Sequence, residues 1–251
     1  MSSLGFMTII SSMVSMGHVG LSAAIPTLGT VIGHARLVPT ILLNHHPGLG
    51  SCHRANTDPK LLHGMLRSSL WGQNAAPSRF LLTGYIPDHQ QICMVADLIR
   101  EWKQQDPHHV FVCDPVMGDT HTGLYIPQEA ANALCEKLIP LAEHVTPNEF
   151  EYHLIKEHIN DNCKVALTSE HEDKQVVAKL LHGEDILARM SAPLQTNAPH
   201  GLGDVFSAAY TKMLFLGSTA TDAFQHAFVK SQDILSHSQK GPHLCFDSYT
   251  A

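Results

Sequence analysis

Short β-type runs alternate with longer helical patterns from Phe6 to about Thr168. This alternation is typical of βαβ units that build a mainly parallel sheet. Six apolar runs are the predicted strands, at residues 6–10, 35–38, 80–83, 110–113, 144–145 and 165–168. The sequence therefore predicts an α/β fold, and its 251 residues suit one domain over positions 1–251.

Helical patterns fill the gaps between these runs. Residues 87–105 carry apolar side chains at helical spacing, and residues 127–138 open with a proline, which fits the first turn of a helix. Beyond Thr168 the pattern changes. Residues 175–181 and 185–190 are two predicted strands joined by a hairpin turn at 182–184. Helices at 203–216 and 221–236 complete the predicted fold, and the last 15 residues resemble a tail.

Composition excludes several classes of protein. The 23 acidic and 16 basic residues give a net charge of −7, which argues against nucleic-acid binding. The same charge repels nucleotide anions, so we expect a bound cation. No apolar run is long enough to cross a membrane, and the N-terminus lacks the pattern of a signal peptide, so we expect a cytoplasmic protein. The six cysteines form no Cys-x-x-Cys pair, and reduced thiols are expected.

A glycine-rich loop, His200-Gly201-Leu202-Gly203-Asp204, opens an apolar segment with the pattern of a buried helix. Glycines let a ligand approach the backbone, and the first turn of a helix offers unpaired N–H groups that bind anions such as phosphate. The positive field of the helix start should keep Asp204 ionised and suited to accept a proton. The loop predicts phosphoryl transfer to a hydroxyl, with Asp204 as base. A tight turn with a capping aspartate is the alternative.

Polar residues follow the predicted strands. In open α/β sheets ligands bind beyond the carboxyl ends of the strands, so these residues should share one crevice. They are Ser11, Ser12, Gly84, Tyr85, Asp114, Thr146, Asn148, Glu151 and Ser169.

Four of the polar side chains are hard oxygen ligands of the kind that Mg²⁺ binds. Asn148 and Glu151 share one helical face, and with Asp114 and Asp204 they would surround a cation that also contacts substrate phosphates. Thr168 and Ser169 offer hydroxyls to phosphate oxygens. For Asn148 and Glu151, a capping arrangement at a helix start is the alternative, and Asp114 alone is equally consistent with a turn.

Six segments in order, residues 12–20, 38–48, 82–85, 112–119, 146–151 and 197–204, resemble the pyridoxal kinases of the ribokinase-like superfamily. The resemblance covers most of the chain. It implies a ribokinase-like three-layer α/β/α fold with a central, mainly parallel sheet. It also implies ATP-dependent phosphorylation of the 5′-hydroxymethyl group of pyridoxal, with pyridoxine and pyridoxamine left open as further substrates.

The resemblance also assigns roles to residues. Asp204 is the expected base, and the N–H groups of Gly201, Leu202 and Gly203 form the expected anion hole for the transferred phosphoryl group. Asp114 and Glu151 match cation-associated acids. The expected vitamin-binding residues are Ser12, His46, Pro47 and Tyr85, and the expected ATP-binding residues are Asp114, Asp119, Tyr125, Thr146, Asn148, Glu151, Thr168 and Ser169. ATP and Mg²⁺ are implied, a need for K⁺ is left open, and a homodimer is expected.

The chain departs from the family pattern at several points. Leu202 replaces a smaller residue, and Leu21 and His45 also differ from the usual residues. Between Glu151 and Thr168 the family usually has a full helix, whereas this chain has only residues 152–167. Loss of a covering helix would expose one face of the sheet. Two alternatives therefore stay open: a hydroxymethylpyrimidine kinase of the same superfamily, and a pyridoxal-binding protein without activity.

Overall fold

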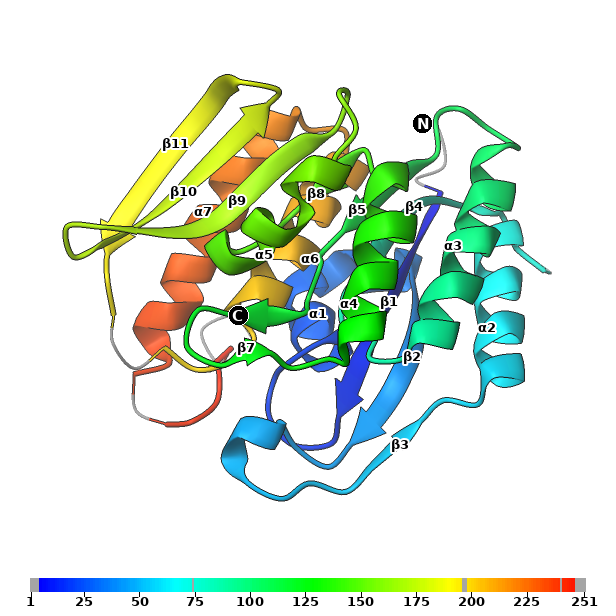
Figure 1. The fold of residues 1–251 in the computed structure, drawn as a ribbon, viewed down its shortest axis with the longest axis horizontal. Helices are drawn as coiled ribbons and strands as arrows, with labels where there is room; N and C mark the ends of the chain where they lie inside the picture. The colour runs from blue at the N-terminus through cyan, green and yellow to red at the C-terminus, as the bar shows by residue number, and fades with distance from the viewer. Residues whose placement is uncertain (1–4, 74, 196–197, 240, 247–251) are drawn as a thin grey trace.

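The computed structural model describes residues 5–73, 75–195, 198–239 and 241–246. Within these residues a main sheet of nine strands is formed by β1 (Phe6–Val14), β2 (Ala35–Leu43), β3 (Arg54–Asn56), β4 (Ser78–Thr83), β5 (Val110–Cys113), β8 (His144–Val145), β9 (Lys164–Glu172), β10 (Gln175–His182) and β11 (Asp185–Pro193). Their order across the sheet is β11-β10-β9-β8-β5-β4-β1-β2-β3 (Figure 1). A small ribbon pairs β6 (Gly118–Asp119) with β7 (Gly123–Leu124).

The six predicted strands form the parallel centre of the sheet, from β2 to β9. The edges are antiparallel. β3 pairs with β2 on one side, and the predicted hairpin of β10 and β11 extends the other side beyond β9. The hairpin turn is the two residues Gly183 and Glu184, and Gly183 has a φ of +57°. The sequence did not predict β3.

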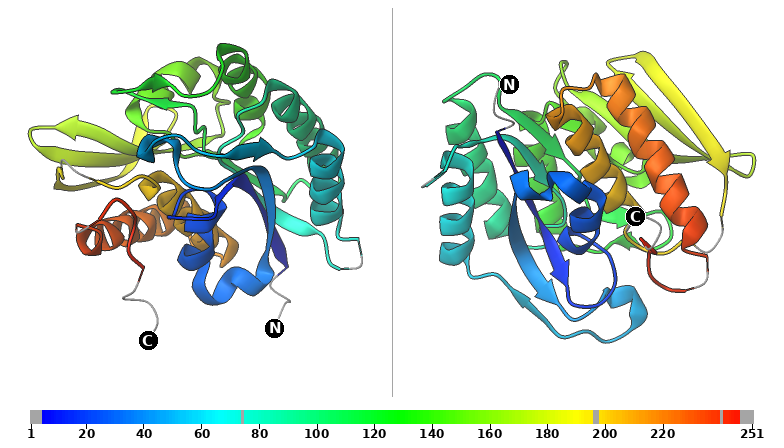
Figure 2. Two further views of the ribbon diagram at one scale, coloured as in Figure 1. Left: turned by 90° about the horizontal axis from the view of Figure 1, so that it is seen from below. Right: turned by 180° about the vertical axis from the view of Figure 1, so that it is seen from behind.

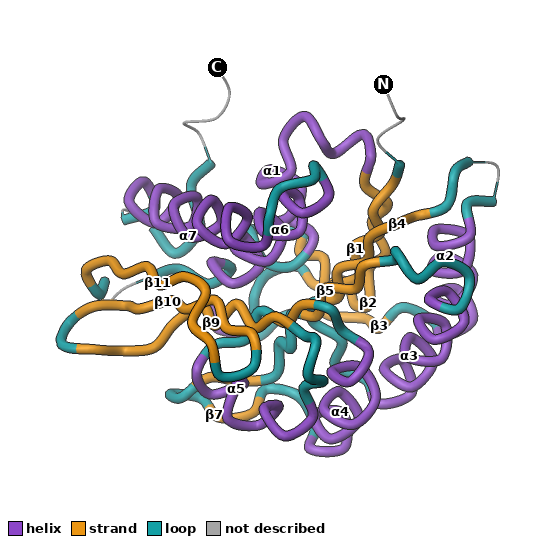
Figure 3. The backbone as a smooth tube through the Cα atoms, turned by 90° about the horizontal axis from the view of Figure 1, so that it is seen from above, coloured by secondary structure: helices purple, strands orange, loops and turns teal. Residues whose placement is uncertain are grey.

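Helices cover both faces of the sheet (Figures 2 and 3). They are α1 (Leu21–Leu28), α2 (Pro59–Trp71), α3 (His89–Lys103), α4 (Gln128–Ala133), α5 (Glu149–Ile155), α6 (Leu202–Phe215) and α7 (Ala220–His237). In Figure 3, α1, α6 and α7 lie on one side of the sheet and α2, α3, α4 and α5 on the other. The expected three-layer α/β/α architecture is confirmed.

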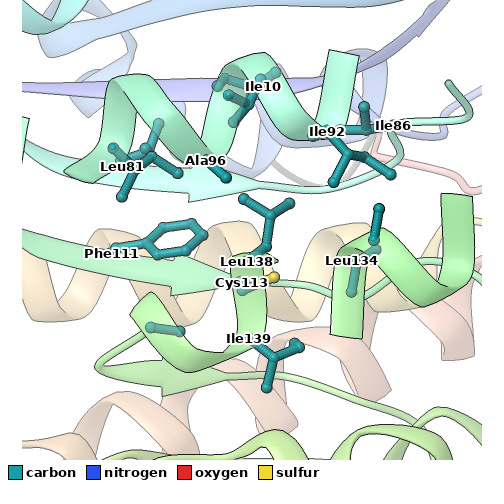
Figure 4. Close-up of a cluster of buried hydrophobic side chains, with 14 of the residues drawn as sticks. Ile10, Leu81, Ile86, Ile92, Ala96, Phe111, Cys113, Leu134, Leu138 and Ile139 are labelled. Carbon is teal, nitrogen blue, oxygen red and sulfur yellow. The ribbon is translucent and has the colours of Figure 1, made fainter. Parts of the chain in front are cut away.

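The central strands alternate their apolar side chains between the two helical layers. Phe111 and Cys113 of β5 pack under α3 and α4 (Figure 4), whereas Val112 packs with Phe206 of α6 on the opposite face. All of these side chains are buried. A strand with both faces covered is continuously apolar, which is why the sequence pattern predicted the central strands.

Local sequence signals fix the helix ends. Asp58 accepts hydrogen bonds from the N–H groups of Lys60 and Leu61 and so caps α2, which starts with a proline. At the other end of α2, Gly72 adopts a left-handed conformation with φ of 72°. Asp88 caps α3 in the same way.

The predicted exposure of a sheet face near residues 152–167 is wrong. The segment contains α5, a short 3-10 turn (Lys156–His158) and a loop that leads to β9. Ile155 and Cys163 are fully buried in the core, where Val165 and Leu167 of β9 are also buried. The short helix α5, the 3-10 turn and a loop therefore cover the sheet where the family usually has a longer helix.

Two further predictions need correction. Ser11 and Ser12 were expected after the first strand, but β1 continues to Val14, so both lie within it. The last 15 residues are not simply a tail. Leu244 is 2% exposed and packs against α6 and α7. Among the helices that the structure describes, none combines the length and apolar character needed to cross a bilayer.

Candidate active site

A cavity of about 590 Å³ lies beyond the carboxyl ends of the parallel strands. Its volume falls in the usual range for small-molecule sites. Most site residues predicted from the sequence line it: the cavity wall includes Ser12, His46, Pro47, Tyr85, Asp114, Asp119, Tyr125, Thr146, Asn148, Glu151, Thr168, Ser169, Gly201, Gly203 and Asp204. Leu202, Ser11 and Gly84 were also expected at this crevice, but they are not among its lining residues. The fold therefore brings residues from Ser12 to Asp204 together at one place.

The N-terminus of α6 forms part of the cavity wall. Gly201 stands before the helix with φ of 103°, and no side chain caps this end of the helix. The N–H groups of Leu202, Gly203 and Asp204 are therefore those that a helix start leaves without an intrahelical acceptor. Asn197, the first residue of the corresponding sequence segment, lies outside the described residues.

Leu202 differs from its neighbours in the loop because its side chain turns away from the cavity. It packs on the apolar cluster of Ala23, Val205, Ile234 and Leu244. Only its backbone N–H is thus offered at the helix start. The departure from the family pattern at this position thus places an apolar side chain against this cluster and leaves the backbone N–H at the helix start.

Asp204 lies in the first turn of α6, where the backbone N–H of Gly20 faces its carboxylate. Burial raises the pKa of Asp204 to about 6, and the nearby N–H of Gly20 opposes this rise. We expected the helix start to keep this carboxylate ionised, and a pKa of about 6 agrees with ionisation at pH 7, although burial makes the group more basic than an ordinary aspartate. The result is a carboxylate that is still mostly ionised at pH 7 and is more basic than usual.

A chain of hydroxyl groups holds Asp114 at the end of β5. Ser207 of α6 donates its proton to Asp114 Oδ2 at 2.8 Å, and the Ser207 and Thr146 oxygens lie 2.7 Å apart. Since the Ser207 proton is used on Asp114, Thr146 donates to Ser207. Burial raises the pKa of Asp114 well above its usual range, with further contributions from the charges of Glu151 and Asp204, while Ser207 opposes the rise.

Asn148 and Glu151 form a capping box at the start of α5. Asn148 Oδ1 accepts the N–H of Glu151, and Glu151 Oε2 accepts the N–H of Asn148. Glu151 Oε1 accepts the N–H of Met117 at 3.0 Å. Burial raises the pKa of Glu151 to about 7, against the effect of these backbone donors. The capping alternative thus describes the geometry of the pair, and the Glu151 carboxylate also faces the cavity.

The remaining acidic and hydroxyl residues on this side shape the loops. Asp119 Oδ1 accepts the N–H groups of His121 and Thr122 in a tight turn. Thr168 donates both its N–H and its hydroxyl to the carbonyl of Pro147, which fastens the loop after β8 to β9. The pKa of Tyr125 is raised by burial and by the carboxylates around it, Glu151 first. This part of the cavity therefore carries a concentrated negative field.

The other side of the cavity is formed by β1, β2 and the loop after β4. The backbone of Tyr85 is held by two hydroxyls, because its N–H donates to Ser11 Oγ and its carbonyl accepts from Thr40. Burial raises the pKa of Tyr85, and the charge of Arg54 opposes the rise. Ser12 is 6% exposed, and Gly20 passes so close to it that a Cβ at Gly20 would lie 2.2 Å from the Ser12 carbonyl.

Sequence reasoning missed several cavity residues, notably Arg54 and His200. Arg54 is the one lysine or arginine among the described lining residues, and it reaches the cavity from β3, an edge strand too short to show a sequence pattern. His200 is the first residue of the predicted glycine-rich loop, so the sequence showed its place beside Gly201 but not the residue that it contacts. That residue is His46, whose ring lies 4.0 Å from the ring of His200 in a stacked arrangement.

Comparison with known proteins places the chain in a family. A sequence family described as phosphomethylpyrimidine kinase matches residues 17–240. The chain belongs to this family. The match includes all but one of the predicted site residues, since Ser12 alone precedes it, and it extends through α7.

Pyridoxal kinases are among the relatives of this chain. The chain is 36% identical over 149 residues to the pyridoxal kinase of Sus scrofa, a match that covers 58% of this chain and 46% of that protein. It is 29% identical over 244 residues to a pyridoxal kinase of Vibrio campbellii, covering 86% of this chain and 82% of the relative. The match to the mammalian relative thus spans about half of its length. The resemblance to pyridoxal kinases is confirmed.

A solved structure shares the fold. The pyridoxal kinase of Leishmania donovani, determined in complex with ADP and pyridoxamine, superposes with a TM-score of 0.80 at 24% identity. The superposition covers 97% of this chain and 94% of that protein. The likeness shows that this member of the phosphomethylpyrimidine kinase family shares the overall fold of that enzyme.

Proposed function

We propose that this protein transfers the γ-phosphoryl group of ATP to the 5′-hydroxymethyl group of pyridoxal, forming pyridoxal 5′-phosphate. One observation carries the proposal: an uncapped helix start and the Asp204 carboxylate lie on the wall of the same cavity. Phosphoryl transfer needs little more from a protein than such positioning and charge stabilisation. Pyridoxine and pyridoxamine carry the same hydroxymethyl group and are further candidate substrates.

Asp204 is the proposed base. With a pKa of about 6 it is mostly ionised at pH 7, and it binds a proton more readily than an ordinary aspartate. It would take the proton of the vitamin hydroxyl as the oxygen attacks phosphorus. The N–H groups of Leu202 and Gly203, with Gly201 shaping the turn, would stabilise the negative charge on the transferred phosphoryl oxygens.

Mg²⁺ fits the acidic side of the cavity. Asp114 and Glu151 are buried acids with raised pKa values, and nearby positive charge would favour their ionised forms. Asp114 is the proposed direct ligand. Both Glu151 oxygens accept backbone N–H groups, so we assign Glu151 to contact through water. Bound Mg²⁺ would neutralise charge on the ATP phosphates. Thr146, Asn148, Asp119, Tyr125, Thr168 and Ser169 would surround the nucleotide side.

The vitamin ring would lie between Ser12, His46, Pro47 and Tyr85. Arg54 favours pyridoxal over hydroxymethylpyrimidine, the substrate class that the family description suggests. The 3-hydroxypyridine ring of pyridoxal ionises to a pyridinium with an anionic 3-oxygen, whereas the pyrimidine has no such oxygen. The charge of Arg54 lowers the pKa of Tyr85 on the vitamin side of the cavity. On the nucleotide side, the charges of Glu151 and Asp204 raise the pKa of Asp114. Positive and negative charge therefore lie on different sides of the cavity.

The test of the function is product analysis with Mg-ATP and each candidate alcohol. We expect phosphate esters of B6 vitamers by mass spectrometry and a loss of about 10²- to 10⁴-fold in turnover for Asp204→Asn. A wild-type protein that binds pyridoxal but forms no ester would instead be the binding protein without activity. Unchanged turnover in Asp204→Asn would remove the assigned base.

The choice of substrate has its own test. We expect Arg54→Gln to lower the ratio of kcat/KM for pyridoxal to kcat/KM for hydroxymethylpyrimidine by about tenfold. A tenfold change corresponds to the lower end of the free energy that a hydrogen bond to a charged group contributes. Arg67→Gln is the matched control, because Arg67 pairs with Glu101 on the surface of α2 and α3. A wild-type preference for the pyrimidine would favour the alternative function.

Three further features follow from the family resemblance and belong to the same proposal: a homodimer, a cytoplasmic location and a dependence on K⁺. Replacing KCl with NaCl in the activity assay measures the K⁺ dependence. Light scattering at several protein concentrations measures the oligomeric state.

A further inference from the structure

After α7 the chain turns back toward the loop that joins β1 to α1. Residues 243–246, which we call the C-terminal strap, fold back along the end of that helix. Ser238 anchors the turn, since its Oγ accepts the N–H of Cys245 at 2.8 Å and donates to the carbonyl of Ile234. Leu244 is 2% exposed and packs with Val205 of α6. The strap is therefore part of the folded core.

The strap lies against a loop that passes from β1 to α1, residues 17–20. The ring of Phe246 packs on the ring of His18, with centroids 4.8 Å apart and planes tilted by 59°. The ring of His243 lies on Gly17, where an added Cβ would stand 2.6 Å from His243 Nδ1. Two aromatic side chains of the strap thus cover two successive residues of the loop.

The loop contacts the two parts of the proposed phosphoryl-transfer machinery. The backbone N–H of Gly20 faces the carboxylate of Asp204 closely enough to lower the pKa of that group. The carbonyl of His18 lies so close to Gly201 that a Cβ there would approach it to 2.0 Å. The strap also reaches Gly201 directly, because the same Cβ would lie 3.1 Å from Leu244 Cδ1. Loop and strap therefore enclose Gly201 from two sides.

We propose that the C-terminal strap is a positioning element for phosphoryl transfer: Leu244 and Phe246 hold the 17–20 loop and Gly201 so that Asp204 and the α6 N–H groups keep their reactive geometry. This inference rests on the proposed function. Neither side chain lines the cavity, so both act through other residues. A small displacement of reacting groups lowers the rate of the chemical step by a large factor. A change in the strap should therefore affect the rate of the chemical step more than it affects substrate binding.

The test compares single substitutions in the full chain. We expect Leu244→Ala and Phe246→Ala to lower kcat by about 10- to 100-fold, while KM for ATP changes less than threefold. Phe246→Tyr keeps the ring against His18 and should restore most of kcat. Leu70→Ala is the matched control. Leu70 is a fully buried residue of α2 that packs in a different apolar cluster from Leu244.

Hydrogen exchange by mass spectrometry supplies a readout besides activity. Faster exchange in residues 17–20 and 201–204 of the Phe246→Ala variant, with unchanged exchange in α3, is the expected result. Wild-type kcat and exchange in both alanine variants would overturn the proposal, as would an equal loss of kcat in Leu70→Ala. If Leu244→Ala fails to fold, the comparison of kcat between Phe246→Ala and Phe246→Tyr still tests the role of the strap. A wild type without kinase activity defeats the proposed function, and the exchange comparison then still tests the strap.

Discussion

The imidazole of His46 stacks on that of His200, with ring centroids 4.0 Å apart and planes inclined by 27°. His46 follows β2, and His200 directly precedes Gly201. Gly48 lies beside both rings, where an added Cβ would stand 2.8 Å from His200 Nε2 and 2.9 Å from His46 Nδ1. The stack therefore joins the proposed vitamin wall to the loop that starts α6.

This stack predicts a loss of stability at acidic pH. Burial, followed by the charges of His200 and His45, lowers the pKa of His46 to about 4. In the unfolded chain His46 becomes protonated near pH 6.5, whereas in the folded chain it stays neutral to a lower pH. The contribution of His46 to the free energy of unfolding is therefore lost as the pH falls from about 6.5 toward 4. We expect urea unfolding to show a larger drop between pH 7.5 and pH 5 for the wild type than for His46→Phe. Equal drops would contradict the assignment.

Asp204 predicts the acidic limb of the activity profile. Its carboxyl, with a pKa of about 6, is protonated as the pH falls through that value and then no longer accepts a proton. Glu151, with a pKa of about 7, titrates nearby, so kcat/KM reports macroscopic values for the group of acids. We expect kcat/KM to fall at least tenfold per pH unit below about pH 6. Full activity at pH 5 would exclude Asp204 as the base.

The two loop glycines predict opposite effects of substitution. Gly201 needs its positive φ and has no room for a side chain, so Gly201→Ala should destabilise the fold. A Cβ at Gly203 meets nothing within 4 Å, and Ala in the first turn should raise stability by up to about 1 kcal/mol. If phosphate approaches this backbone, Gly203→Ala should still lose at least tenfold in kcat. Thermal unfolding and turnover measured on both variants separate the two roles, and a fully active Gly203→Ala would contradict the anion hole.

Ser207 predicts a change in Mg²⁺ dependence. Ser207→Ala removes the donor that lowers the pKa of Asp114 and the acceptor for Thr146. The Mg²⁺ concentration for half-maximal activity should rise several-fold, and unfolding should become easier by about 1–2 kcal/mol. Ser231→Ala is the control, since Ser231 is a buried helical serine whose hydroxyl donates to the Ala227 carbonyl of its own helix. An unchanged Mg²⁺ requirement in Ser207→Ala would argue against Asp114 as the ligand.

The central strands and most cavity residues were predictable because their signals are local. A strand covered on both faces is apolar throughout, as Val110–Cys113 is, and polar residues directly follow such runs. The pKa of Asp204 was not predictable, since the sequence shows the helix start but not the burial that outweighs its field. The coverage of β9 by Ile155 and Cys163 was hidden for the same reason, because the sequence shows only a shortened segment.

The sequence by itself determined the α/β class, the polar residues that follow the parallel strands, and the glycine loop at the start of α6. These features were visible because periodicity, turn chemistry and motif spacing are properties of neighbouring residues. Only the tertiary structure decided that Arg54 reaches the cavity, that His46 meets His200, and that Phe246 covers His18. These contacts join residues far apart in the chain. Packing of whole layers creates them, and no local pattern encodes which distant side chains will meet.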